Sequence, residues 1–157
     1  MAAKPKDPAR YTEVRNPKAL RDFFIHDKFE AGVKLTGSEV KSIRAGKAQL
    51  ADAFARVDKG EAWLYGAYIE EYSYAGLSQH APRRPRKLLL HAREIDKLVQ
   101  QVETSGRVIV ALRMYFKEAL VKVEIATASG KKQYDKREDL KQREQNLEAR
   151  RALHSRQ

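Results

Sequence analysis

Six stretches of the chain alternate hydrophobic with polar residues or concentrate β-branched, aliphatic and aromatic ones, which is typical of β-strands. They are residues 23–29, 51–57, 62–69, 88–90, 108–116 and 120–126, with residues 117–119 as the turn between the last two. In the first stretch Phe23, Ile25 and Phe29 fall on one face, and Gly32 is expected to bend or bulge the strand. Residues 58–61 predict a hairpin turn.

Helix-start signals add two helices and one short helical turn. Asn16 followed by Pro17 suits the start of the turn, because Asn caps a helix and Pro fits its first position. Thr36 and Glu39 have the spacing of a capping box, which predicts a helix that ends near residue 45. Apolar residues at helical spacing predict a second helix over residues 92–104, which should cover the sheet. Strands and helices do not alternate regularly, so we predict a mainly β fold with two or three helices, arranged as a small barrel.

The charge of the chain narrows the class of partner. Lys and Arg number 32 against 21 Asp and Glu, so the formal net charge is +11 and the pI is about 9.9. Such a surplus favours polyanions, above all nucleic acid. No apolar run is long enough to span a membrane and the first residues lack the apolar core of a signal peptide, so we expect a cytoplasmic protein with no membrane partner. With 157 residues we expect one domain, and a monomer.

The composition divides the chain into three parts. Residues 1–15 are expected to be a flexible basic arm, and residues 16–130 the folded RNA-binding domain. Residues 131–157 hold nine Lys or Arg, five Asp or Glu and few apolar side chains. We therefore expect this basic C-terminal tail to be disordered when free. Its charges are nevertheless spaced for a helix, so it can fold on a charged RNA surface.

Candidate catalytic chemistry is missing from the sequence. The four His residues lack metal-ligand spacing, Cys is absent, and there is neither a Gly-rich phosphate loop nor a nucleophile elbow. We therefore expect no enzyme activity, no metal and no cofactor. A nuclease would need a metal-ligand set, and we find none.

Two groups of basic residues are candidate RNA contacts. They are Lys41, Arg44 and Lys47 on the first predicted helix, and Arg83, Arg84, Arg86 and Lys87 in a run that contains Pro82 and Pro85. The prolines limit the entropy that the arginines lose on binding, which favours phosphate contacts over a merely solvated loop.

Other side chains leave two interpretations open. Tyr65, Tyr68, Tyr72 and Tyr74 belong either to the core and rim of the barrel or, in one or two cases, to stacking faces for unpaired bases. Glu30 is either an exposed charge at the end of a strand or an acceptor for base amino groups or a 2′-hydroxyl.

Four segments in order along the chain resemble the small protein B family, also called SsrA-binding proteins. They are residues 29–32 (Phe-Glu-Ala-Gly), 35–48, 86–91 and 130–138, and the match runs from Asn16 to about Leu147. The resemblance implies an OB-like closed barrel that binds the tRNA-like domain of tmRNA and has no catalytic role. It also implies a function in trans-translation: with the elongation factor that delivers aminoacyl-tRNA, such a protein places alanyl-tmRNA in the vacant decoding site of a stalled ribosome. The tail, helical on the ribosome, then lies in the empty mRNA channel.

The resemblance also implies specific contact residues. Asn16, Glu30, Leu89 and Lys122 match positions associated with tmRNA binding, and His91 lies in a matched segment. The positions that match the ribosome-binding tail are Gly130, Lys131, Lys132, Tyr134, Asp135, Lys136 and Arg137. The chain departs from the common pattern at Pro85, Ala126 and Ser129, which puts individual contacts in doubt. The alternative function is a general rRNA-binding ribosomal protein or assembly factor.

Overall fold

The structure, a computed structural model, describes residues 13–72, 76, 79–131 and 133–155. These residues include nine strands and four helices. In chain order the elements are β1 (Val14–Arg15), α1 (Pro17–Asp22), β2 (Phe23–Val33), α2 (Gly37–Arg44), β3 (Ala48–Gln49), β4 (Phe54–Asp58), β5 (Glu61–Tyr65), β6 (Tyr68–Ile69), β7 (Arg86–Leu89), α3 (Ala92–Ser105), β8 (Val108–Lys117), β9 (Leu120–Gly130) and α4 (Gln133–Ser155). Residues 1–12 of the predicted arm, Tyr74 and Lys132 lie outside the described residues.

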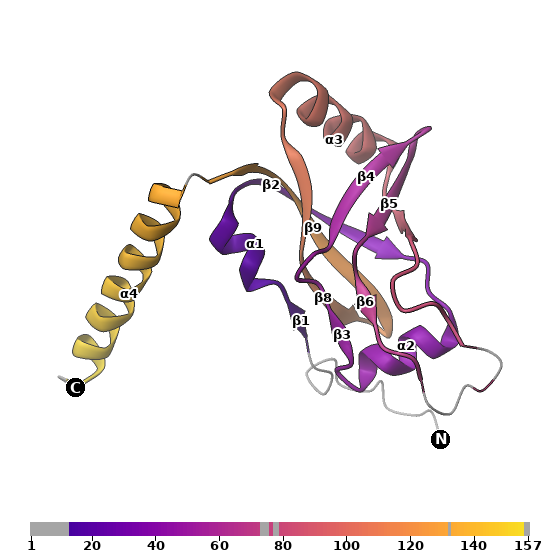
Figure 1. Cartoon of the computed structure of the whole chain (residues 1–157), viewed down its shortest axis with the longest axis horizontal. Coiled ribbons are helices and arrows are strands. Elements are labelled where there is room, and N and C mark those ends of the chain that lie inside the picture. Colours follow the sequence, from indigo (N-terminus) through magenta and orange to yellow (C-terminus); the bar gives the residue numbers. More distant parts are fainter. Residues whose placement is uncertain (1–12, 73–75, 77–78, 132, 156–157) are drawn as a thin grey trace.

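Six antiparallel strands close into a ring in the order β8-β4-β5-β7-β2-β9, because β9 pairs again with β8 (Figure 1). These are the six strands that the residue pattern predicts, so the mainly β fold is confirmed. The predicted strand 62–69 is interrupted after Tyr65, and its last part, β6, pairs with β3. Two short strands were missed: β3, and β1, which extends the sheet beside β8. We expected the folded part to begin at Asn16. It begins earlier, because Val14 is buried in β1.

A β-bulge in β2 decides which hydrophobic residues face the inside of the ring. The register with β9 skips one residue between Ile25 and Lys28, and the Asp27 amide donates to the Thr127 hydroxyl instead (3.1 Å). Phe23 and Ile25 therefore pack in an outer cluster beneath α1, whereas Phe29 packs against the main core. The prediction that these three residues share a face was wrong, because one extra residue reverses the alternation.

Gly32, where we placed the bulge, has a different role. It lies in regular register with both neighbouring strands, and a Cβ added there would come within 3.3 Å of the Leu89 Cβ. The missing side chain lets β7 and β2 lie close together at this point.

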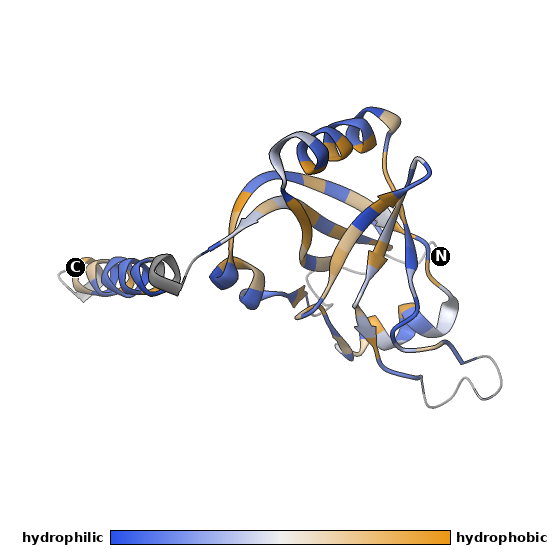
Figure 2. Cartoon of the chain, turned by 45° about the horizontal axis from the view of Figure 1, so that its top comes forward, coloured by the Kyte–Doolittle hydropathy of each residue, from blue (hydrophilic) through white to orange (hydrophobic). Residues whose placement is uncertain are grey.

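Two helices close the ends of the ring. Figure 1 shows α2 at one end of the strands and α3 at the other. Ile43 of α2 and Leu98 of α3 are both fully buried in the same core. Both helices occupy their predicted positions, and Gly106 ends α3 in a left-handed conformation (φ 63°). Hydrophobic residues accordingly concentrate on the ring, while α4 is predominantly hydrophilic (Figure 2).

The predicted tail is the fourth helix, α4, which projects away from the ring (Figure 1). All its described side chains are exposed, including Leu140 and Leu147. Arg143 donates to the Leu20 carbonyl of α1 (3.2 Å). The expectation that this segment is disordered in the free protein and folds on the ribosome stays a prediction.

Gly66 separates β5 from β6 and allows a close backbone contact. Its φ is +75°, and an added Cβ would lie 2.3 Å from the Asp52 carbonyl oxygen. Gly60, in the predicted turn between β4 and β5, has nearly the same φ (+76°) but open space around it. The two glycines thus share a backbone conformation and differ in their surroundings.

We expect Gly66→Ala to reduce the free energy of unfolding much more than Gly60→Ala. At Gly60 an Ala meets only the left-handed strain of about 1–2 kcal/mol. At Gly66 the clash with Asp52 adds to that strain, for a total of about 3 kcal/mol or more. Urea unfolding of both variants measures the difference. Equal losses would show that the contact with Asp52 does not constrain this turn.

Candidate nucleic-acid interface

A groove of about 720 Å³ on the outer surface of the ring brings together five of the predicted RNA-binding residues. They are Glu30, Lys87, Leu89, His91 and Lys122. They come from β2, β7, the start of α3 and β9, which lie far apart in the sequence. Strand pairing brings these residues together, because Gly32 is the partner of Leu89 on one side and of Lys122 on the other. Gly32, which has no side chain, therefore lies between Leu89 and Lys122 at the floor of the groove.

Leu89 is the apolar element of this groove. Along β7, Arg86 and Leu88 face inward and are buried, so Lys87 and Leu89 face outward. Leu89 is 54% exposed in the middle of the sheet surface. An isolated exposed Leu is ordinary, but this one lies among polar groups that converge on one groove. The groove therefore offers an apolar contact together with Lys87 and Lys122.

Glu30 is held as a hydrogen-bond acceptor at the edge of the groove. It lies within β2, opposite Glu124, rather than at the end of the strand, and its side chain is exposed. Its contact with RNA stays a prediction. The Tyr115 hydroxyl donates to its carboxylate, and Lys117 Nζ lies 3.2 Å away. The hydrogen bond from Tyr115, then that from Lys117, lowers the pKa of Glu30 below its ordinary value. Glu30 is thus an oriented anion at neutral pH.

Tyr115 and Lys117 are site residues that the sequence analysis missed. Met114 and Phe116 are buried, so Tyr115 and Lys117 must face outward on β8. Alternation could have placed them on the surface, but their contact with Glu30 depends on the pairing of β8, β9 and β2. Burial, followed by the hydrogen bond to the Glu30 anion, raises the pKa of Tyr115, so it remains a donor.

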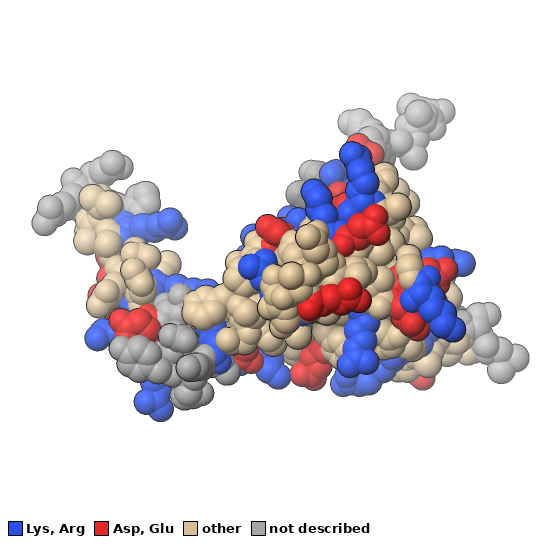
Figure 3. Space-filling model, turned by 90° about the horizontal axis from the view of Figure 1, so that it is seen from above, with Lys and Arg blue, Asp and Glu red and all other residues tan. Residues whose placement is uncertain are grey.

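On the face of the molecule seen in Figure 3, basic and acidic side chains are interspersed. The predicted basic residues of α2 are exposed, and Lys41 and Arg44 lie over the rings of Tyr72 and Phe116 (5.3 and 5.8 Å to the centroids). Lys47, just after α2, is also exposed. These three residues do not line the groove, so their RNA contacts would belong to a separate surface.

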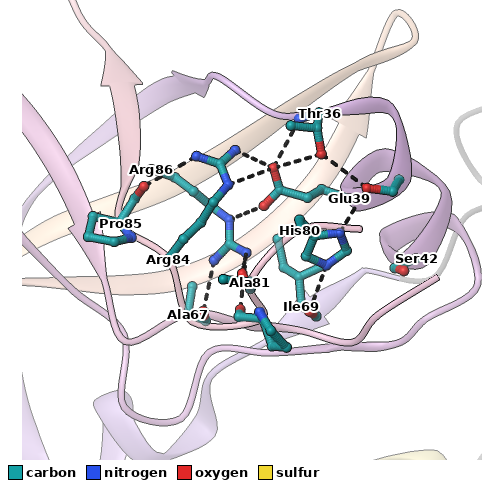
Figure 4. A network of polar contacts seen from close by, with 12 residues as sticks. Thr36, Glu39, Ser42, Ala67, Ile69, His80, Ala81, Arg84, Pro85 and Arg86 are labelled. Carbon is teal, nitrogen blue, oxygen red and sulfur yellow. Dashed lines mark hydrogen bonds and ion pairs between the residues drawn. The ribbon is translucent and has the colours of Figure 1, made fainter. Parts of the chain in front are cut away.

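The predicted arginine run is divided between the surface and the core. Arg83 is exposed and lies over the Tyr68 ring (5.3 Å), while Tyr65 stacks on Phe54. Arg84 is partly buried and Arg86 is fully buried, and both pair with Glu39 (Figure 4). A phosphate contact from Arg86 does not fit this placement, because its guanidinium is enclosed and already paired.

Glu39 organises a buried polar network between α2, β7 and the loop before β7 (Figure 4). Its carboxylate accepts from the Thr36 amide at the start of α2 (2.9 Å) and from both arginines. Arg86 also donates to the carbonyls of Ala67 (2.9 Å) and Pro82 (3.0 Å). Burial alone would raise the pKa of Glu39, but the hydrogen bonds from Arg84, Thr36 and Arg86 outweigh it and lower that pKa.

A buried histidine fastens the same loop to α2. His80 Nε2 lies 2.9 Å from the Ile69 carbonyl and Nδ1 lies 2.9 Å from the Ser38 hydroxyl. A carbonyl can only accept, so Nε2 carries the proton and Nδ1 accepts from Ser38. The loop before β7 is thus held in place by His80 and by the hydrogen bond from Arg86 to the Pro82 carbonyl.

Asn16 lies away from the groove. It is buried and caps α1, since its side-chain oxygen accepts from the Ala19 amide (3.3 Å). Its amide nitrogen donates to the Ala111 carbonyl (2.8 Å). Asn16 thereby joins α1 to β8, and its expected RNA contact stays a prediction.

The root of the tail is attached to the corner between α1 and β2. Gly130 ends β9 opposite Phe23, and the Lys131 amide donates to the Asp22 carbonyl (2.9 Å). Lys131 Nζ lies over the Phe24 ring (5.1 Å). Arg137 is exposed on α4. The side chains of Tyr134, Asp135 and Lys136 lie outside the described residues, so their expected roles stay predictions.

The described part of the chain contains no group of three or more His, Asp or Glu side chains that could hold a metal ion. Its helices are either too short or too polar to cross a membrane.

Comparison with known proteins identifies clear relatives. The profile of the family described as SmpB protein matches residues 13–155. An SsrA-binding protein of Thermobifida fusca is 50% identical over 145 residues, 92% of this chain and 91% of the relative. An SsrA-binding protein of Bifidobacterium adolescentis is 52% identical over 141 residues, 89% of each chain. A solved structure described as "tmRNA-SmpB: a journey to the center of the bacterial ribosome" is 42% identical with a TM-score of 0.65, covering 77% of this chain and 85% of that one.

We expect Glu39→Gln to reduce the free energy of unfolding by about 3–5 kcal/mol, because it leaves the buried Arg86 charge without its counter-ion. Glu61→Gln is the control: it breaks an exposed ion pair with Lys87 (3.3 Å) and should cost less than about 1 kcal/mol. Urea unfolding at neutral pH measures both.

Acid unfolding gives a second measurement of the same pair. The pKa of Glu39 is lowered on folding, so its anion stabilises the protein above the ordinary value of 4.5, and this contribution is lost as the pH falls through the folded pKa. Glu39→Gln should lack that part of the acid sensitivity. An unchanged stability at neutral pH in this variant would contradict the role that we assign to Glu39.

Proposed function

The chain belongs to the SmpB protein family, and on that basis we propose that it binds the tRNA-like domain of tmRNA and acts in trans-translation. In this function it delivers alanyl-tmRNA to the vacant decoding site of stalled ribosomes, together with the elongation factor that carries aminoacyl-tRNA. It acts as a cytoplasmic monomer and as a binding protein, without catalysis of its own.

One observation carries the assignment of the RNA-binding surface: five predicted contact residues line one groove. Glu30, oriented by Tyr115, accepts hydrogen bonds from base amino groups or a 2′-hydroxyl, which a phosphate cannot donate. Lys87 and Lys122 attract the backbone on either side. Leu89 packs against the apolar face of a sugar or base. The groove therefore combines affinity from the lysines with selectivity from Glu30.

The closed ring of six strands is the rigid scaffold for these contacts, and we propose that it is an OB-like barrel. Its two ends are closed by α2 and α3, so the outer surface is the part left for RNA. OB folds bind nucleic acid on such strand surfaces and the loops beside them. The folded unit selects RNA by shape, because the groove residues are fixed by strand pairing.

The tail supplies the second half of the function. We propose that the segment after Gly130 is disordered in the free protein and becomes helical in the mRNA channel of a ribosome that holds no message there. Its described residues on α4 are exposed and largely charged, which suits a channel lined by rRNA. A channel that contains mRNA leaves no space for the tail, so the tail distinguishes stalled ribosomes from translating ones.

We expect Leu89→Ala to weaken binding of the tRNA-like RNA about tenfold, the loss of one well-placed apolar contact. Leu147→Ala is a matched control, because Leu147 is 53% exposed against 54% for Leu89 but lies on α4. Fluorescence anisotropy with labelled tRNA-like RNA measures both, with unrelated rRNA fragments as competitors. Equal affinities for tmRNA and rRNA would instead support a general rRNA-binding factor.

We expect a chain that ends at Gly130 to bind the tRNA-like RNA with near-normal affinity and to fail in tagging. The groove lies entirely within the retained residues. Gel shift measures the binding, and tagging of a nascent peptide on ribosomes stalled at a truncated message measures the function. Loss of RNA binding on truncation would contradict the two-part division.

A further inference from the structure

A second groove, of about 710 Å³, lies on the outside of the ring and shares no residue with the first. It is enclosed by α1, β4, the last turns of α3 and the start of β8. Its volume is in the range of sites that hold small ligands or single groups of larger ones. Asn16, an expected tmRNA contact, lies at its edge, but the proposed function assigns no RNA group to the rest of the groove.

Exposed hydrophobic side chains from three elements meet in this second groove. Phe54 of β4 and Val102 of α3 are each 38% exposed, and Val108 of β8 is 46% exposed. Phe54 and Val110 are direct cross-strand partners, so the apolar wall continues across β4 and β8. Three large apolar residues converging on one hollow leave water-exposed surface that a ligand would cover.

Phe54 contacts both a second aromatic ring and a guanidinium. Its ring lies nearly parallel to that of Tyr65, with centroids 5.6 Å apart and planes inclined by 20°. The Arg56 guanidinium lies over Phe54 as well, 5.4 Å from the centroid. Aromatic rings and guanidinium planes are the two kinds of surface on which proteins stack unpaired RNA bases. An aliphatic protein side chain has no planar face to stack on the guanidinium.

Polar groups at the rim complete the site. Glu103 and Arg107 both line the groove, and Arg107 also donates to Gln101 (3.0 Å). A carboxylate accepts from base amino or imino groups and a guanidinium donates to base oxygens or nitrogens, so the pair can address the edge of a base. The chain's net charge of +11 favours the approach of an RNA strand to either groove.

We propose that the second groove binds an unpaired RNA nucleobase, which stacks on Phe54 and Arg56. It is a site for single-stranded RNA, separate from the groove that contains Glu30 and Leu89. The protein thus holds two RNA segments on different parts of the ring surface.

Binding of short single-stranded RNA to the full-length protein tests the proposal. Fluorescence anisotropy with hexanucleotides of adenosine or of uridine gives affinities, and methyl NMR shows where they bind. Phe54→Leu keeps an apolar side chain but removes the ring, and should weaken binding about tenfold. Phe54→Tyr should restore it. Arg56→Lys keeps the charge and should still weaken binding, because an ammonium group cannot stack.

The methyl NMR signals show which of the two grooves binds the RNA. The methyl groups of Val102 and Val108 should shift on RNA binding, and they should shift equally in Leu89→Ala, which alters only the first groove. Unchanged hexanucleotide affinity in both Phe54→Leu and Arg56→Lys would overturn the proposal, as would shifts confined to Leu89. Loss of tagging in Phe54→Leu with unchanged RNA affinity would assign the groove to a protein partner and would also overturn it.

Discussion

The buried ion pair of Glu39 and Arg86 is the interaction on which the arrangement around it depends. Both side chains are fully buried, so neither charge can be solvated if the other is lost. Arg86 in turn holds the carbonyls of Ala67 and Pro82, and Glu39 holds the first turn of α2. One charge pair therefore fastens a helix, a strand and a long loop to the same end of the ring. Arg84 adds a partly exposed second cation to the same carboxylate.

The inward direction of Arg86 also determines the outward direction of the RNA-binding residues. Side chains alternate along β7, so a buried Arg86 and Leu88 require Lys87 and Leu89 on the surface. The close approach at Gly32 then places Leu89 beside β2 and within reach of Lys122 on β9. The groove that contains Glu30 and Leu89 is therefore a consequence of core packing. Its residues lie on paired strands and need no long loop to hold them in place.

In the proposed function, the two grooves and the tail differ in rigidity and therefore in what each can recognise. Groove residues on paired strands keep their geometry, which suits the selection of one RNA shape. The described residues of the tail contact the corner formed by Leu20, Asp22 and Phe24, and α4 presents exposed charge. A segment of that kind adapts to its surroundings at an entropic cost, so it suits a test for free space rather than a test for shape.

Local patterns along the chain predict the six strands of the ring, the cap of α2, the position of α3 and the residues from which the groove is built. These features depend on alternation, on helical spacing, on capping residues and on short motifs. Which faces are buried and which arginines reach the surface follows instead from the packing of distant segments. The bulge at Asp27 reverses the face of Phe23 and Ile25, and Arg86 turns inward to a carboxylate 47 residues earlier in the chain. The physical reason is that both outcomes depend on partners distant in sequence: Thr127 satisfies the bulge and Glu39 neutralises the arginine, and no local pattern contains either contact.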